Sequence, residues 1–110
     1  MKGLTLFMEA ILDRHIIIDQ AICHGKPHLA GHRIRVQDIA VWHEQLGMSV
    51  PEICANYNLS LSEVYAALAY YFDYRERIDQ DITADQAYVE AFKKQNPSLL
   101  QQRLKELRGQ

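Results

Sequence analysis

The amino-acid sequence predicts a mainly α-helical protein: a three-helix, helix-turn-helix-like (winged-helix-like) unit with a short N-terminal β element or hairpin and a helical C-terminal tail. Three observations predict this fold class. An apolar face with helical spacing precedes two capping-box patterns, a tight turn separates the helices that those boxes begin, and a β-branched, glycine-containing segment comes before all of them. With 110 residues, 48% of them hydrophobic and 24% charged, the chain can form one core but not two full domains.

The N-terminal part is expected to hold the β structure. Residues 4–12 have the pattern of a short amphipathic helix, and residues 15–18 are β-branched enough to favour a strand that ends at Asp19. Residues 23–35 contain a proline and two glycines, which exclude a regular helix. We therefore expect an arm there, with a small hairpin around Gly31.

Three helices should follow the arm. The first has an apolar face and is stopped by Gly47. The second is short and begins at the capping box of Ser49 and Glu52, and the third is longer and begins at the capping box of Ser60 and Glu63. The apolar face of the first helix comprises Val36, Ile39, Ala40, His43 and Leu46, with Trp42 at its edge, and that of the third comprises Leu61, Val64, Leu68, Tyr71 and Phe72.

The third helix can run to Ile78, which gives a helix-turn-helix-like domain over residues 1–78 and a helical C-terminal extension over residues 79–110. Within this extension Thr83 and Gln86 form a third capping pattern, and the Asn96-Pro97 pair is expected to end one helix and begin the last.

Charge is segregated along the chain. Residues 22–37 carry three cations and no acid, residues 38–92 carry a net charge of −8, and residues 93–110 carry +4. DNA affinity depends on Lys and Arg near phosphates, yet residues 36–72 contain neither. Any DNA contact should therefore come mainly from the arm, although a merely solvated hairpin is an equal alternative. The candidate DNA-binding residues are Lys26, His28, His32, Arg33 and Arg35 of the arm, with Ser62 and Tyr65 at the start of the third helix.

A second stripe on the third helix is expected to bind protein. It consists of Ala66, Ala67, Tyr70 and Tyr74, in which small residues permit close approach and tyrosines provide contact area. This stripe predicts a homodimer. The alternative is that the tail helices cover it within one monomer.

Enzymatic chemistry is not expected. Cys23, His24, His28 and His32 include metal-ligating residue types, but Pro27 forbids the helix that would bring them together. His43 is expected to be a hydrogen-bonded core residue rather than a catalytic base. We expect no metal, no cofactor and no catalytic residue. No apolar run approaches the ~20 residues that cross a bilayer, and two isolated cysteines suggest free thiols, so a cytoplasmic protein without membrane contact is expected.

Residues 16–74 resemble a known family through four motifs. These are Asp19-x-x-Ile22-Cys23-x-Gly25-Lys26-Pro27, Gly31-x-Arg33-Ile34-x-Val36, Gly47-x-Ser49 with Glu52-Ile53, and Val64-x-Ala66-Ala67-Leu68-x-Tyr70. Together they resemble the small prokaryotic domain-of-unknown-function family numbered four hundred and thirty-three, which is described as antitoxin-like. The sequence departs from the usual pattern at Gln20, where a proline is common.

The resemblance implies a three-helix, winged-helix-like fold and a PIN-fold ribonuclease toxin as a partner, bound by segments outside the DNA-facing unit. It favours a DNA-binding antitoxin or regulator of a toxin–antitoxin pair. The alternative is a protein-interaction module without DNA binding, which the lack of Lys and Arg in residues 36–72 favours. A metal-dependent enzyme centred on the arm is a third and weaker hypothesis.

Overall fold

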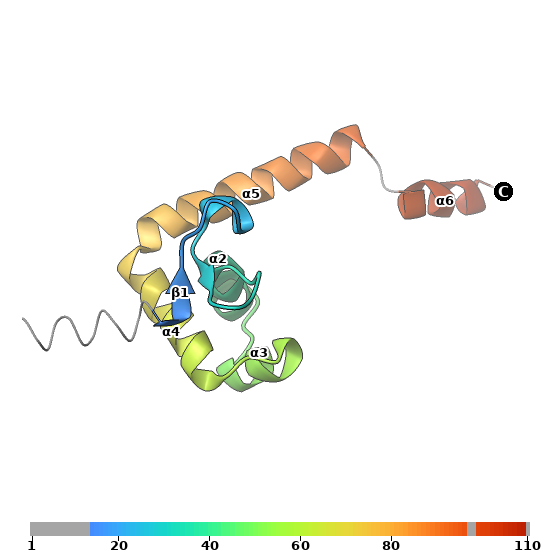
Figure 1. The fold of residues 1–110 in the computed structure, drawn as a ribbon. Coiled ribbons are helices and arrows are strands. Elements are labelled where there is room, and N and C mark those ends of the chain that lie inside the picture. The colour runs from blue at the N-terminus through green and yellow to red at the C-terminus, as the bar shows by residue number, and fades with distance from the viewer. Residues whose placement is uncertain (1–13, 97–98, 110) are drawn as a thin grey trace, which may run out of the picture. The chain divides into compact units, whose positions relative to one another are not determined.

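The computed structural model describes residues 14–96 and 99–109, so the helix expected over residues 4–12 lies outside the described part. Within that part the protein is mainly helical, with five α-helices and a short antiparallel pair of strands near the N-terminus (Figure 1). None of the described helices combines the length and the apolar character needed to span a membrane. The chain divides into two compact units, Met1–Asp79 and Gln80–Gln110.

The β structure forms where the sequence predicts it. Strand β1 (Ile16–Ile17) pairs antiparallel with strand β2 (His28–Leu29), with Ile16 opposite Leu29. A tight turn around Gly31 then folds the chain back on β2, because the Leu29 amide donates to the Ile34 carbonyl at 2.9 Å. Leu29 is fully buried, so this segment is part of the core.

Helix α2 (Val36–Ala40) continues into a π-helical turn, η2 (Val41–Gln45), and Gly47 follows with a φ of +71°. Its first turns bury Val36, Ile39 and Ala40 as predicted, but Leu46 is 66% exposed. The π-helical turn explains the difference, since its wider spacing rotates the later residues away from the core face.

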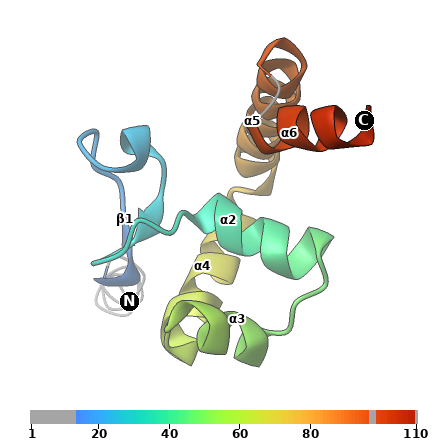
Figure 2. The same cartoon turned by 90° about the vertical axis from the view of Figure 1, so that its right-hand side faces the viewer.

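Helices α3 (Val50–Tyr57) and α4 (Leu61–Asp73) begin at the two predicted caps. The Ser49 hydroxyl accepts from the Glu52 amide at 3.2 Å, and the Ser60 hydroxyl accepts from the Glu63 amide at 3.1 Å. Between the helices Asn58 adopts a left-handed conformation, which ends α3 and turns the chain. Figure 2 shows α2, α3 and α4 as neighbouring helices, and α4 packs against both of the others.

The core face of α4 differs from the predicted one. Leu61 and Phe72 are 55% and 51% exposed, whereas Ala66 and Ala67 are buried together with the expected Val64, Leu68 and Tyr71. Ala67 is fully buried on α4, which packs against both α2 and α3. The largest fully buried side chains of the core are Leu29, Ile39, Ile53, His28, Val36 and Val64.

The helices after α4 also differ from prediction. Helix α4 ends at Asp73 rather than continuing to Ile78, and helix α5 (Arg75–Gln95) runs straight through Thr83, where the sequence suggested a cap. Neither glycine nor proline interrupts residues 75–95, so nothing stops the helix there. Helix α5 ends just before Asn96 as expected, and helix α6 (Leu99–Arg108) forms the last described element.

Candidate functional site

The arm is not a free extension of the protein. His28 is only 2% exposed, and its Nδ1 lies 3.2 Å from the Lys26 carbonyl oxygen. Its ring is therefore a core side chain and cannot reach a nucleic acid outside the fold.

The charge of Arg35 is balanced by Asp38, which lies in the first turn of α2. The Arg35 guanidinium donates from Nε to Asp38 Oδ2 at 3.2 Å and from Nη2 to Asp38 Oδ1 at 2.9 Å. The Arg35 amide donates to the same carboxylate at 2.9 Å, so the pair also caps the start of α2. The sum of charges over residues 22–37 did not reveal this pairing, because Asp38 lies just beyond residue 37.

His32 also contacts an acidic side chain, that of Glu63. Its Nε2 lies 2.9 Å from Glu63 Oε2, and Glu63 Oε1 accepts from the Ser60 amide at 2.9 Å. The Ser60 amide is the main reason that the pKa of Glu63 is lowered from its ordinary value of 4.5, with further lowering by the Ser60 hydroxyl and by His32. This carboxylate therefore joins the arm to the first turn of α4.

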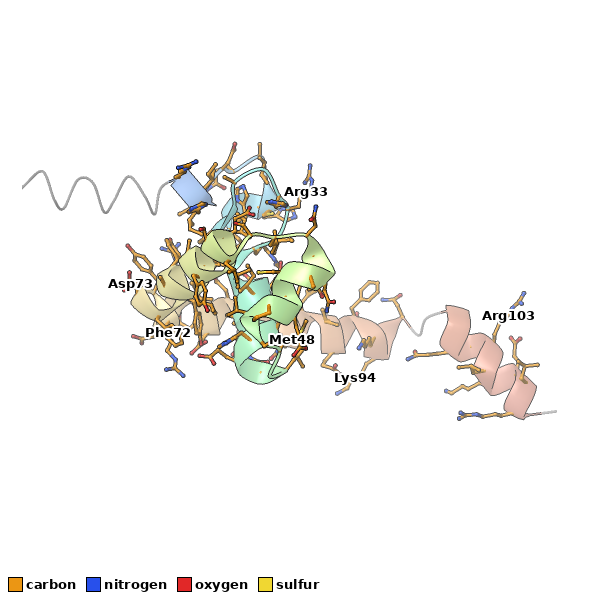
Figure 3. The ribbon with its side chains drawn as sticks, turned by 90° about the horizontal axis from the view of Figure 1, so that it is seen from below. Arg33, Met48, Phe72, Asp73, Lys94 and Arg103 are labelled. Atoms are coloured by element: carbon orange, nitrogen blue, oxygen red, sulfur yellow. The ribbon has the colours of Figure 1, made fainter. Side chains whose placement is uncertain are left out.

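Arg33, Ser62 and Tyr65 are the predicted DNA contacts that remain exposed, while Lys26 is half-buried. Figure 3 shows the Arg33 side chain pointing away from the helices. Its backbone is held in place, because the Cys23 Sγ donates to the Arg33 carbonyl oxygen at 3.3 Å.

The turn before β2 is strained. Cys23, His24 and Gly25 have φ angles of +52°, +54° and +77°, a left-handed conformation that costs energy for the two non-glycine residues. A Cβ atom at Gly25 would come within 2.7 Å of the Gln20 side-chain amide. In the described part of the chain, no three His, Cys, Asp or Glu side chains gather as a metal ion would require.

His43 is not the satisfied core histidine that the sequence suggested. It is half-buried, and its Nδ1 lies 3.4 Å from Glu44 Oε2. The two atoms are not aligned for a hydrogen bond, so this buried nitrogen has no hydrogen-bond partner among the described residues. No described nucleophile is paired with it.

Helix α4 carries an exposed apolar stripe, which consists of Leu61, Tyr65 and Phe72. The sequence placed Leu61 and Phe72 in the core and Tyr65 on the DNA-facing side. In contrast, two members of the predicted interface, Ala66 and Ala67, are buried inside the monomer, and this leaves Tyr70 and Tyr74, whose rings lie 4.6 Å apart. Partial burial raises the pKa of Tyr70.

A second apolar surface lies where η2 meets α3, and sequence reasoning missed it. The Trp42 and Tyr57 rings stack at 3.8 Å with an interplanar angle of 2°. Leu46 is exposed, and the Met48 amide donates to the Trp42 carbonyl at 2.9 Å. We call Trp42, Leu46, Met48 and Tyr57 the Trp42 patch; Met48 is labelled in Figure 3. Its members come from different elements, so only the tertiary structure reveals it.

The C-terminal unit exposes apolar side chains too. On α5, Tyr88 is 71% exposed, and Val89 and Phe92 are also exposed; all three lie within one to four residues of each other on the helix. On α6, Leu104 and Leu107 are exposed at a spacing of three residues.

These features define a small helical protein that joins a strand pair to three packed helices and presents apolar helix surfaces to solvent. Residues 16–71 match the model of the family described as protein of unknown function, DUF433, and the chain belongs to this family. A solved structure of a DUF433 member protein from Anabaena variabilis is similar to it, with 30% sequence identity and a TM-score of 0.59. The match covers 74% of this chain and 80% of that chain. A search of curated proteins finds no match.

Proposed function

We propose that this chain is an antitoxin-like, helix-turn-helix-like protein whose main activity is to bind a protein partner through its C-terminal tail. The observation that carries the proposal is the exposed apolar face of α5. Tyr88, Val89 and Phe92 are uncovered in the described chain, and aromatic anchors on one helix face are typical of helix-mediated protein binding. The family resemblance adds a class of partner, a PIN-fold ribonuclease.

The electrostatics favour this protein-binding function over DNA binding through the arm. Of the charges expected on phosphates, those of Arg35 and His32 are offset by Asp38 and Glu63, and His28 is in the core. The α4 stripe, on the helix that would read DNA, is apolar rather than cationic. We assign no catalytic role to the chain.

DNA binding is a second candidate function, and the arrangement of α3, a tight turn and α4 favours it. If DNA is bound through the arm, Arg33→Ala should lower the slope of log affinity against log salt by about one unit. Arg35→Ala should instead lower stability with little change in slope, because its charge is already paired. A gel-shift titration with no shift at low salt would end this candidate.

The homodimer remains part of the proposal, but the interface predicted for it from the sequence is too small. With Ala66 and Ala67 in the core, the predicted interface is reduced to Tyr70 and Tyr74. A stable interface buries about 800 Å² per partner, far more than two tyrosines provide.

The test of partner binding is a titration of the full chain with the protein encoded by the adjacent gene. The double variant Tyr88→Glu/Phe92→Glu should weaken binding at least about tenfold, since buried charge opposes docking of an apolar face. Tyr65→Glu/Phe72→Glu is the matched control, because it places the same two charges on an exposed tyrosine and an exposed phenylalanine of the other unit. If the tail variant still binds and the control does not, the interface lies on α4 instead of α5. If the wild-type chain does not bind the neighbouring protein, the antitoxin assignment is rejected.

A further inference from the structure

We infer that the C-terminal unit binds a phosphate-bearing polyanion in an open hollow between the end of α5 and one face of α6. The hollow has a volume of about 630 Å³, which is typical of sites for small ligands. Residues of α6 spaced three and four apart form most of its wall, and the last turn of α5 adds a lysine. The lining residues are Lys93, Gln101, Gln102, Leu104, Lys105 and Arg108.

The charge of the hollow is positive. Three of its lining side chains are cationic, and none of the described lining residues is acidic. Lys105 and Arg108 form no ion pair with any described residue, and Lys93 Nζ lies 4.0 Å from Glu90 Oε1, at the outer limit of an ion pair. These like charges repel one another around the hollow, so an anion bound among them would be attracted by all three.

Helix ends alone do not account for this grouping. A cation in the last turn of a helix is favoured by the helix dipole, and both α5 and α6 end with two basic residues. The dipole does not select the side of the helix on which a cation lies. Lys94 and Arg103, which are labelled in Figure 3, belong to the same two helices but do not line the hollow.

The chemistry of the lining indicates phosphate groups. An arginine guanidinium can donate two parallel hydrogen bonds to a phosphate, and lysine ammonium groups and glutamine amides donate further ones. Leu104 is the one apolar residue of the described lining, which offers no aromatic ring for base stacking. The hollow therefore recognises a run of phosphates, carried by a free oligophosphate or by a nucleic-acid strand. This inference is independent of the proposed function, because it uses neither Tyr88 nor Phe92.

A matched pair of full-length variants tests the site. Wild type and variants are titrated in a calorimeter with tripolyphosphate and, separately, with a short oligothymidylate, both near physiological ionic strength. Lys93→Ala/Arg108→Ala should weaken binding about tenfold, because two charge-assisted hydrogen bonds are lost. Lys94→Ala/Arg103→Ala also removes one lysine of α5 and one arginine of α6, so its net charge is the same. This control should bind within about twofold of the wild type, since its cations lie outside the hollow.

The two probes distinguish the sources of phosphate. Binding of tripolyphosphate alone identifies a free oligophosphate as the ligand, and binding of oligothymidylate alone identifies a nucleic-acid strand. Arg33→Ala should leave either affinity unchanged, which separates this site from DNA binding through the arm. The inference is overturned if neither probe binds the wild type, if the two double variants lose affinity equally, or if Arg33→Ala alone abolishes binding.

Discussion

Glu63 links local and tertiary structure at a single residue. Its carboxylate accepts the Ser60 amide at the start of α4 and also contacts His32 of the arm at 2.9 Å. The sequence predicts the first contact from the capping-box spacing, since it needs only residues three apart. It cannot predict the second, because thirty residues and two turns separate the partners.

The lowered pKa of Glu63 predicts a pH-dependent stability. A carboxyl group whose pKa is lower in the folded state stabilises the fold above its ordinary pKa of 4.5, and this stabilisation is lost as pH falls through the folded-state value. Glu63→Gln should therefore lower the thermal midpoint at pH 7, and the two proteins should converge at acidic pH. Glu76→Gln on the exposed part of α5 serves as the control, and parallel melting curves at every pH would contradict the prediction.

Gly25 should tolerate no side chain. Its φ of +77° disfavours an L-residue, and a Cβ would lie 2.7 Å from the Gln20 amide, so we expect Gly25→Ala to lower the free energy of unfolding by about 1–3 kcal/mol. Gly31→Ala has nearly the same φ with nothing within 4 Å of the new Cβ, and should cost less. Chemical denaturation measures both, and equal losses would show that the contact with Gln20 is unimportant.

At the scale of elements, capping patterns predict helix starts well only where the chain also breaks before them. Ser60 follows the left-handed Asn58, and its pattern begins a helix. Thr83 follows an uninterrupted helical run, and its pattern lies inside α5. The apolar face of α4 was predicted only in part, because the buried face depends on where α2, α3 and the two strands pack against the helix.

Alanine substitutions separate the two capping patterns. Ser60→Ala should cost about 1 kcal/mol, because it removes the acceptor for the Glu63 amide. Thr83→Ala should be neutral or stabilising by a few tenths of a kcal/mol, because alanine is the better residue inside a helix. Thermal unfolding followed by circular dichroism compares them, and a loss at Thr83 as large as that at Ser60 would indicate a real helix start there.

At the scale of the whole molecule, the arm belongs to the core of the N-terminal unit. Leu29 is fully buried, and β2 packs against α4. Leu29→Ala should therefore lower the free energy of unfolding by about 2–5 kcal/mol, as expected for a large-to-small change in a core. Leu104→Ala on exposed α6 should cost little. If Leu29→Ala lowers the free energy of unfolding no more than Leu104→Ala does, the arm is a solvated hairpin, the alternative that the sequence also allowed.

The sequence by itself determined the helical class, the presence of short β structure near the N-terminus, the helix starts at Ser49 and Ser60, and the family resemblance that the match over residues 16–71 bears out. Each of these depends on residues close together in the chain or on motifs that can be read directly. Only the tertiary structure decided which charges face solvent. His32 contacts Glu63, and Trp42 stacks on Tyr57, because folding brings different elements together, and the periodicity of the sequence carries no information about which elements will touch.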